Sequence, residues 1–191
     1  TSDESKKSVI HFDIQKTNEL IDGNWSEESI AKFGKTNHEQ ITQHGIKSLT
    51  KDKEIDVIIG GPPCQAYSIA GRAQDNNSMK DDYRNYLFES FVKVVDAFLP
   101  KVFVFENVPG ILSASPGDKL VTERIYEAFK VSGYNILDPK KLQTATFTAT
   151  DFGVAQKRNR VIIIGVKNNS DFDLNCIYSA IKAQTLKVKK T

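Results

Sequence analysis

The stretch DVIIGGPP, residues 56–63, indicates the fold class. Its apolar residues follow one another without alternation and stop at two glycines and two prolines, which predicts a buried strand ending in a turn. A second run, VFVF at residues 102–105, has the same character. Between the two runs, apolar residues from Leu87 to Phe98 recur at helical spacing and stop before Pro100. Strand, helix and strand in this order are typical of α/β proteins. We therefore predict an α/β fold with a doubly wound, mostly parallel sheet.

Weaker patterns extend this core on both sides. Apolar spacing and capping residues predict helices over Gln15–Ile21, from Ser26 to Gly34 and over Leu120–Val131, and strands over Val9–Phe12, Tyr134–Leu142 and Val161–Val166. The segment from Ala66 to Tyr83 shows no periodicity, and its length indicates a functional loop.

Composition narrows the class of protein. The chain has 191 residues, enough for one domain with a real core. No apolar run approaches the roughly 20 residues of a membrane helix, and the polar start does not resemble a signal peptide. Cys64 and Cys176 are the two cysteines, and without a CxxC pair they suggest neither a metal site nor a disulfide framework. We therefore expect a soluble, cytoplasmic protein that binds no metal.

The net charge of +2 hides an uneven distribution. Residues 1–60 hold 8 basic and 11 acidic side chains, whereas residues 151–191 hold 8 basic and 3 acidic ones. The basic excess lies in the run from Lys157 to Arg160 and in the tail from Lys187 to Lys190. Such a run can bind phosphate, but a short basic terminus is more often simply solvated.

Reactive side chains follow two of the predicted strands and precede a third. Cys64 comes directly after the first strand, where Pro62 and Pro63 stiffen the turn. A thiol in this place can be a nucleophile if its surroundings favour the thiolate. Alternatively, it is a small buried side chain that only packs in the core. Glu106 follows the second strand, and a carboxyl group beside a buried strand can donate a proton or simply pair with an arginine.

The third group is the stretch QKRNR, residues 156–160. Arg158 and Arg160 are two residues apart at the start of the apolar run VIIIG, so they share one face and can bind an anion or a base edge together. Taken alone, the same stretch is an ordinary basic strand edge.

Taken together, these motifs resemble the C5-cytosine DNA methyltransferase family. The resemblance rests on PPCQ at residues 62–65, ENV at 106–108 and the QxRxR pattern at 156–160, in this order. It also includes DDYRNYLF at 81–88 and ATDFGVAQKRNRVIIIG at 149–165. The resemblance is specific from about Ile55 to Val166 and implies the Rossmann-like fold of S-adenosylmethionine-dependent methyltransferases, incomplete at the N-terminus.

The family resemblance implies a chemistry for these residues. Members flip a cytosine out of double-stranded DNA and methylate its C5. By this resemblance Cys64 adds to C6 of the base, Glu106 binds and protonates N3, and Asn107 supports Glu106. Arg158 and Arg160 contact the base and the phosphate backbone. The resemblance also places Gln65, Ser68 and Gln156 at the flipped nucleotide, and the loop Ala66–Tyr83 over the DNA.

The cofactor half matches the family less well. Phe12, Asp13 and Pro62 are the residues that the resemblance assigns to S-adenosylmethionine. The family's Phe-x-Gly-x-Gly loop is not found, since the first glycine is Gly23. We expect residues 1–54 to be a remnant of the cofactor-binding half, 55–166 to carry the catalytic motifs, and 167–191 to be a basic C-terminal segment of one partial domain. The target-recognition domain is expected to be absent, and the chain alone to bind S-adenosylmethionine weakly.

Several explanations of this pattern stay open. The chain is either a fragment of a longer DNA methyltransferase from a prokaryotic restriction-modification system, or half of a split enzyme with a complementing subunit, or a catalytically silent DNA-binding relative. A fourth interpretation keeps the chemistry but replaces DNA by transfer RNA.

Overall fold

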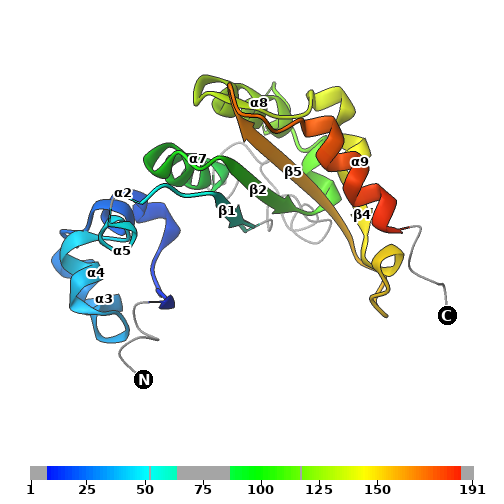
Figure 1. The fold of residues 1–191 in the computed structure, drawn as a ribbon. Helices are drawn as coiled ribbons and strands as arrows, with labels where there is room; N and C mark the ends of the chain where they lie inside the picture. Colours follow the sequence, from blue (N-terminus) through cyan, green and yellow to red (C-terminus); the bar gives the residue numbers. More distant parts are fainter. Residues whose placement is uncertain (1–7, 52, 64–86, 117, 186–191) are drawn as a thin grey trace. The chain divides into compact units, whose positions relative to one another are not determined.

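The computed structural model describes residues 8–51, 53–63, 87–116 and 118–185. They form two compact units (Figure 1). The first contains the chain up to Ile55 together with Glu89–Leu99, and the second contains the remainder.

The first unit is helical. Its elements are η1 (Ile14–Lys16), α2 (Thr17–Asp22), α3 (Glu27–Phe33), η2 (Gly34–Thr36), α4 (Glu39–His44), α5 (Lys47–Thr50) and most of α7 (Leu87–Phe98). Trp25, Phe33 and Ile41 form a buried cluster, against which Ile10 and Phe12 pack. The predicted helices at Gln15–Ile21 and Ser26–Gly34 are confirmed, with Ser26 capping α3 by accepting a hydrogen bond from the Ser29 amide.

The strand predicted at Val9–Phe12 is wrong, because these residues belong to no strand. The side chain of Asn37 takes the place of a neighbouring strand. Its Oδ1 accepts from the His11 amide at 3.2 Å, and its Nδ2 donates to the His11 carbonyl oxygen at 2.8 Å. Ile10 and Phe12 are half-buried because they cover the helical cluster rather than a sheet face, whereas Val9 is 72% exposed.

The second unit contains a mixed sheet. Its strands are β1 (Val57–Gly60), β2 (Val102–Asn107), β3 (Tyr134–Asn135), β4 (Thr146–Thr148) and β5 (Asn159–Lys167), in the order β1-β2-β5-β3 with β4 also paired to β5. β1 and β2 are parallel, whereas β5 is antiparallel to β2, β3 and β4. The α/β class is confirmed, but the described sheet is mixed rather than mostly parallel.

The remaining elements of this unit are η4 (Pro109–Ser113), α8 (Val121–Val131), η5 (Pro139–Ala145), η6 (Ala149–Phe152) and α9 (Leu174–Thr185). α8 confirms the helix predicted over Leu120–Val131. On one face of the sheet the Phe103 ring stacks on Phe129 of α8, with ring centroids 4.0 Å apart. The Phe103 ring lies over Gly165, where an added Cβ would come within 2.0 Å of it. Because Gly165 has no side chain, the Phe103 ring of β2 has room to lie over it and to stack on Phe129.

Three strands differ in their bounds from the prediction, and β5 spans Asn159–Lys167 instead of Val161–Val166. Strand β3 ends at Asn135 instead of reaching Leu142, because Asp138 caps η5 and Pro139 begins it. Strand β2 runs on through Glu106 and Asn107, because β5 pairs with both residues. The acidic side chain thus lies within a paired strand, which restricts its position.

Candidate active site

Glu106 and Arg160 form an ion pair between β2 and β5. Ile162 is the register partner of Glu106, and Arg160 lies two residues before it on the same face of the sheet. The guanidinium Nε meets Oε1 of the carboxylate, and Nη1 of the same group donates to the Asn159 carbonyl oxygen at 2.7 Å. The side chains are 39% and 21% exposed for Glu106 and Arg160. The pair is therefore ordered by two strands and still accessible to a ligand.

Asn107 connects the ends of the two parallel strands. The residue is 2% exposed. Its Nδ2 donates to the Pro62 carbonyl oxygen at 3.3 Å, and its Oδ1 accepts from the Val108 amide at 2.9 Å. The amide thus holds the turn after β1, two residues before Cys64, and the hydrogen bonds of its side chain go to backbone rather than to the Glu106 carboxylate.

Gly61 lies against the Glu106 carboxylate. A Cβ at this position would lie 2.8 Å from Oε2 of Glu106. The turn after β1 and the acid after β2 are therefore close neighbours at the carboxyl ends of two parallel strands, the edge where α/β proteins bind ligands. The sequence predicts site residues at Pro62 and Glu106 but not at Gly61, since only the paired strands show how closely the two segments approach.

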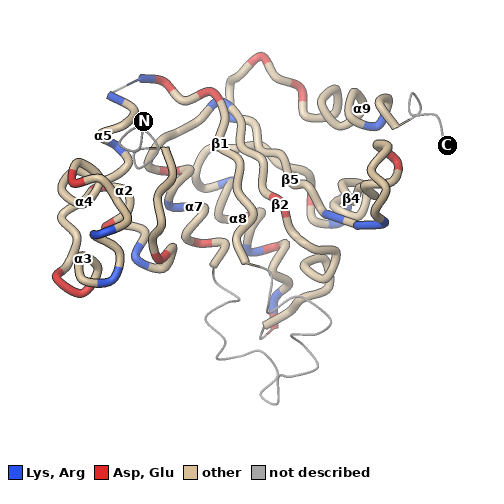
Figure 2. Tube along the Cα trace, turned by 90° about the horizontal axis from the view of Figure 1, so that it is seen from below, with Lys and Arg blue, Asp and Glu red and all other residues tan. Residues whose placement is uncertain are grey.

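The basic residues of QKRNR differ in their surroundings. Gln156, Lys157 and Arg158 are exposed and precede β5, and the Arg158 carbonyl oxygen accepts from the Ala149 amide at 2.9 Å. Within the described residues, the Arg158 side chain makes no hydrogen bond or ion pair, whereas Arg160 pairs with Glu106. Basic positions gather where β4 lies beside β5 (Figure 2). Arg158 is thus available to an anion outside the chain.

The other predicted site residues lie elsewhere. Cys64, Gln65 and Ser68 are outside the described residues. Asp13, in the helical unit, caps η1 by accepting from the Gln15 amide at 3.0 Å. The ring of Phe12 packs against Trp25 and Phe33, with ring centroids 4.1 and 5.2 Å away. The described structure therefore brings together Pro62, Glu106, Asn107 and Arg160.

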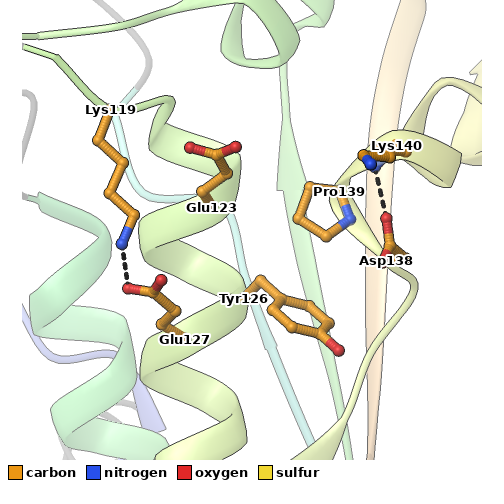
Figure 3. A pocket seen from close by; sticks show the side chains of 7 residues that line it. All are labelled: Lys119, Glu123, Tyr126, Glu127, Asp138, Pro139 and Lys140. Carbon is orange, nitrogen blue, oxygen red and sulfur yellow. Dashed lines mark hydrogen bonds and ion pairs between the residues drawn. The ribbon is translucent and has the colours of Figure 1, made fainter.

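A separate cavity of about 370 Å³ lies between α8 and η5 (Figure 3). It is lined by Lys119, Glu123, Tyr126, Glu127, Asp138, Pro139 and Lys140. Lys119 pairs with Glu127, and the Asp138 carboxylate accepts from the Lys140 amide. None of the predicted site residues lines this cavity.

Comparison with known proteins decides the family. Residues 12–191 match the family model of the C-5 cytosine-specific DNA methylases. The chain belongs to this family. The DNA methylase match covers both units and includes the turn at Pro62, the Glu106–Arg160 pair and the QKRNR stretch. Methyltransferases of this family use S-adenosylmethionine in general.

Individual DNA methylases resemble part of this chain. It is 42% identical over 136 residues to the Type II methyltransferase M.Bpa9945I of Bacillus paralicheniformis, which covers 70% of this chain and 30% of that protein. It is 45% identical over 123 residues to the Type II methyltransferase M.DdeI of Desulfomicrobium norvegicum, covering 64% and 26%. The matched part thus spans less than a third of either relative.

One solved structure also resembles the chain. It comes from a prophage in E. coli and is described as a DNA modification methyltransferase, with 35% identity and a TM-score of 0.47. The match covers 64% of this chain and 30% of that one.

Two further observations on the described residues concern metals and membranes. Among the described residues, no three histidine, cysteine, aspartate or glutamate side chains gather where a metal ion would bind. In the same part of the chain, no helix is long and apolar enough to span a membrane.

Proposed function

We propose that this chain is part of a DNA (cytosine-5)-methyltransferase that modifies DNA in a prokaryotic restriction-modification system. The observation that carries the proposal is the Glu106–Arg160 pair beside the Gly61–Pro62 turn. This arrangement places an acid and a cation at one edge of the sheet, beside the turn at which the PPCQ motif begins. Family membership and the Type II methyltransferases among the relatives support the same function.

The proposed reaction begins with the base. The Cys64 thiolate forms a bond to C6 of a flipped-out cytosine, and the ring electrons move towards C5 and N3. Glu106 takes up a proton from solvent as the base binds and gives it to N3, which limits the negative charge on the ring. Arg160 orients this carboxyl group through Oε1. Arg158, exposed before β5, contacts the DNA backbone or the base.

Methyl transfer and release of the methylated base complete the proposed reaction. S-adenosylmethionine, when bound, supplies the methyl group that C5 takes up. A base then removes the proton from C5, the bond between C6 and Cys64 breaks to restore the aromatic ring and the thiolate, and N3 returns its proton to Glu106. Asn107 contributes by holding the Pro62 carbonyl, and with it the turn that leads to the nucleophile. Gln65, Ser68 and Gln156 are proposed to contact the flipped nucleotide.

The three proposed cofactor residues differ in how well their surroundings allow a contact with S-adenosylmethionine. Oδ1 of Asp13 accepts from the Gln15 amide, and within the described residues no hydrogen bond reaches Oδ2, so a ribose hydroxyl can bind there. Phe12 fits an adenine contact less well, because Trp25 and Phe33 already pack against its ring. Pro62 is half-buried, and its carbonyl is bonded to Asn107. We therefore keep Asp13 as the stronger cofactor candidate.

Covalent trapping tests this function. The protein, expressed from its complete reading frame, is incubated with S-adenosylmethionine and DNA that contains 5-fluorocytosine, whose C5 fluorine blocks the final elimination. We expect a complex that survives denaturation, that is lost in Cys64→Ala and that remains in Cys176→Ser. Equal trapping in Cys64→Ala would overturn the assignment of the nucleophile.

Parallel reactions separate the remaining alternatives. Trapping by 5-fluorocytosine in transfer RNA but not in DNA would favour the RNA substrate. DNA binding without trapping would favour a silent regulatory relative, and trapping only after addition of a second polypeptide would favour a split enzyme. We propose a cytoplasmic location, where the DNA and S-adenosylmethionine are found.

A further inference from the structure

Among the described residues, no strand pairs with the middle of β5 on one of its sides. Strand β2 pairs with residues 161–166 on the other side. On the first side, β4 pairs with residues 159–161 and β3 with residues 166 and 167, so the described residues leave 162–165 unpaired there. Buried backbone groups in such a gap need another partner.

The hydroxyl of Tyr178, on α9, fills this gap. It accepts a hydrogen bond from the Ile164 amide at 2.9 Å and donates one to the Ile162 carbonyl oxygen at 2.8 Å. Tyr178 is 5% exposed, and burial raises its pKa to about 12. The hydroxyl therefore stays protonated at neutral pH and can donate and accept at once. One side chain thus replaces a missing piece of strand.

Tyr178 contacts the register partners of both residues of the Glu106–Arg160 ion pair. Ile162, to which the hydroxyl donates, is the register partner of Glu106. The Tyr178 ring lies parallel to that of Phe147, with planes 1° apart and centroids 6.5 Å apart, and Phe147 is the register partner of Arg160. Arg160 and Phe147 therefore share a sheet face, and Tyr178 supports the strand on which Arg160 lies.

We propose that Tyr178 is a positioning residue for the candidate active site. Its hydroxyl holds the first half of β5 in place and thereby keeps Arg160 against Glu106. The role in methyl transfer rests on the function proposed above, whereas the effect on Arg160 is a property of the structure alone. Exposure of Arg160 to solvent is thus the quantity to measure.

The test compares Tyr178→Phe with a matched substitution. Tyr134→Phe removes a hydroxyl from an equally buried tyrosine in the same unit, where the hydroxyl donates to the Pro100 carbonyl oxygen at 2.7 Å. Both variants lose one buried hydroxyl and keep the ring. Hydrogen exchange of the Ile164 amide and of the Arg160 Nε–H is measured by NMR in each variant of the full chain.

We expect Tyr178→Phe to accelerate exchange at both groups by about tenfold, since the Ile164 amide loses its partner and β5 opens more often. In Tyr134→Phe both rates should match those of the unsubstituted chain, even if thermal stability falls by a similar amount. Unchanged Arg160 exchange in Tyr178→Phe, or equal acceleration in both variants, would overturn the proposal. Methyl transfer is not needed for this measurement, so its result is independent of the proposed function.

A second measurement needs no substitution and covers the case in which Tyr178→Phe does not fold. In the unsubstituted chain, exchange is followed at low urea concentrations. The proposal predicts that the Ile164 amide and the Arg160 Nε–H become accessible with the same urea dependence, since one local opening exposes both. Independent urea dependences would contradict it.

Discussion

Arg160 reaches diagonally across two antiparallel strands to bind the Glu106 carboxylate, and both side chains keep access to solvent. An ion pair with this exposure contributes little to folding, roughly 0–1 kcal/mol. Its position next to Gly61 and the Pro62 turn supports the proton-donor role proposed above.

Glu106→Gln should therefore separate activity from stability. The amide cannot deliver a proton to N3, so we expect methyl transfer to fall by about 10²–10⁴-fold. The free energy of unfolding should change by less than about 1 kcal/mol. Methyl transfer is measured with labelled S-adenosylmethionine and DNA, and unfolding with urea.

The control for this prediction is Glu127→Gln. It makes the same chemical change in the Lys119–Glu127 pair, which lies in the same unit and is also partly exposed. We expect small stability effects in both variants and loss of activity only in Glu106→Gln. Equal activity in the two variants would exclude Glu106 as a proton donor.

The second prediction concerns the thiol of Cys176. A hydrogen bond to the Asp173 carboxylate raises the pKa of this exposed thiol, and the negative charge of the same group adds to the effect. A raised pKa leaves less thiolate at pH 8, so Cys176 should react slowly with iodoacetamide. Asp173→Asn removes the charge but keeps an oxygen to cap α9. We expect faster alkylation, with the pH–rate profile moved to lower pH.

Mass spectrometry of the peptide that contains Cys176 gives the alkylation rate. The control is Asp171→Asn, an exposed acid two residues earlier. If it accelerates alkylation as much as Asp173→Asn, the local hydrogen bond does not set the reactivity of this thiol.

The third prediction tests the packing of the sheet. In Gly165→Ala the new methyl group would lie 2.0 Å from the Phe103 ring, which itself stacks on Phe129. We expect a loss of about 1–3 kcal/mol or more, because the ring has no room to move in a buried stack. Urea unfolding followed by circular dichroism measures the change.

Gly133→Ala is the comparison for Gly165→Ala. Gly133 has a φ of +83°, and an added Cβ would meet nothing within 4 Å. Only backbone strain remains, so the cost should be about 1 kcal/mol. A larger loss in Gly133→Ala than in Gly165→Ala would show that contact with Phe103 is not what requires glycine in β5.

Much of the second unit could be predicted from the sequence. The runs that become β1, β2 and β5 are apolar, and such runs indicate strands. The burial predicted for β1 is wrong, since Val57 and Ile59 are 50% and 74% exposed. The direction of β5 could not be predicted, because a run buried on both faces looks the same in either direction. Strand β4 was missed because its three residues, Thr146–Thr148, carry too little apolar pattern. The strand at Val9–Phe12 failed because Asn37, distant in sequence, supplies the hydrogen bonds of a neighbouring strand.

The candidate site, too, could be predicted from the sequence only in part. Glu106 and Arg160 were predicted because polar residues at strand ends are conspicuous in sequence, and Asn107 was predicted from the family resemblance. The paired strands bring Glu106 and Arg160 together. Tyr178 was missed because its role depends on the gap between β3 and β4, which appears only when the register is known. The roles of Cys64, Gln65 and Ser68 stay predictions, since these residues lie outside the described part of the chain.

The fourth prediction concerns the helical unit, where two glycines lie against each other. Gly45 has a φ of +62°, and a Cβ there would lie 2.2 Å from the Ile21 carbonyl oxygen and 2.5 Å from the Gly23 amide nitrogen. The adjoining backbone bonds run from Ile46 to Leu20 and from Trp25 to Thr42. Gly45→Ala should therefore separate the ends of α2 and α4 and cost more than about 3 kcal/mol, from strain and steric overlap together.

Trp25 is the one tryptophan of the chain and is 5% exposed, so its fluorescence reports on this unit selectively. We expect Gly45→Ala to shift its emission to longer wavelength in the absence of urea. The control is Gly34→Ala, since Gly34 has a φ of −60° and an added Cβ would meet the side chain of Ile30, which is 49% exposed and can move, at 3.2 Å. This variant should keep the unsubstituted spectrum. If Gly45→Ala kept it too, the close approach of Gly45 to α2 would not be needed for the folded unit.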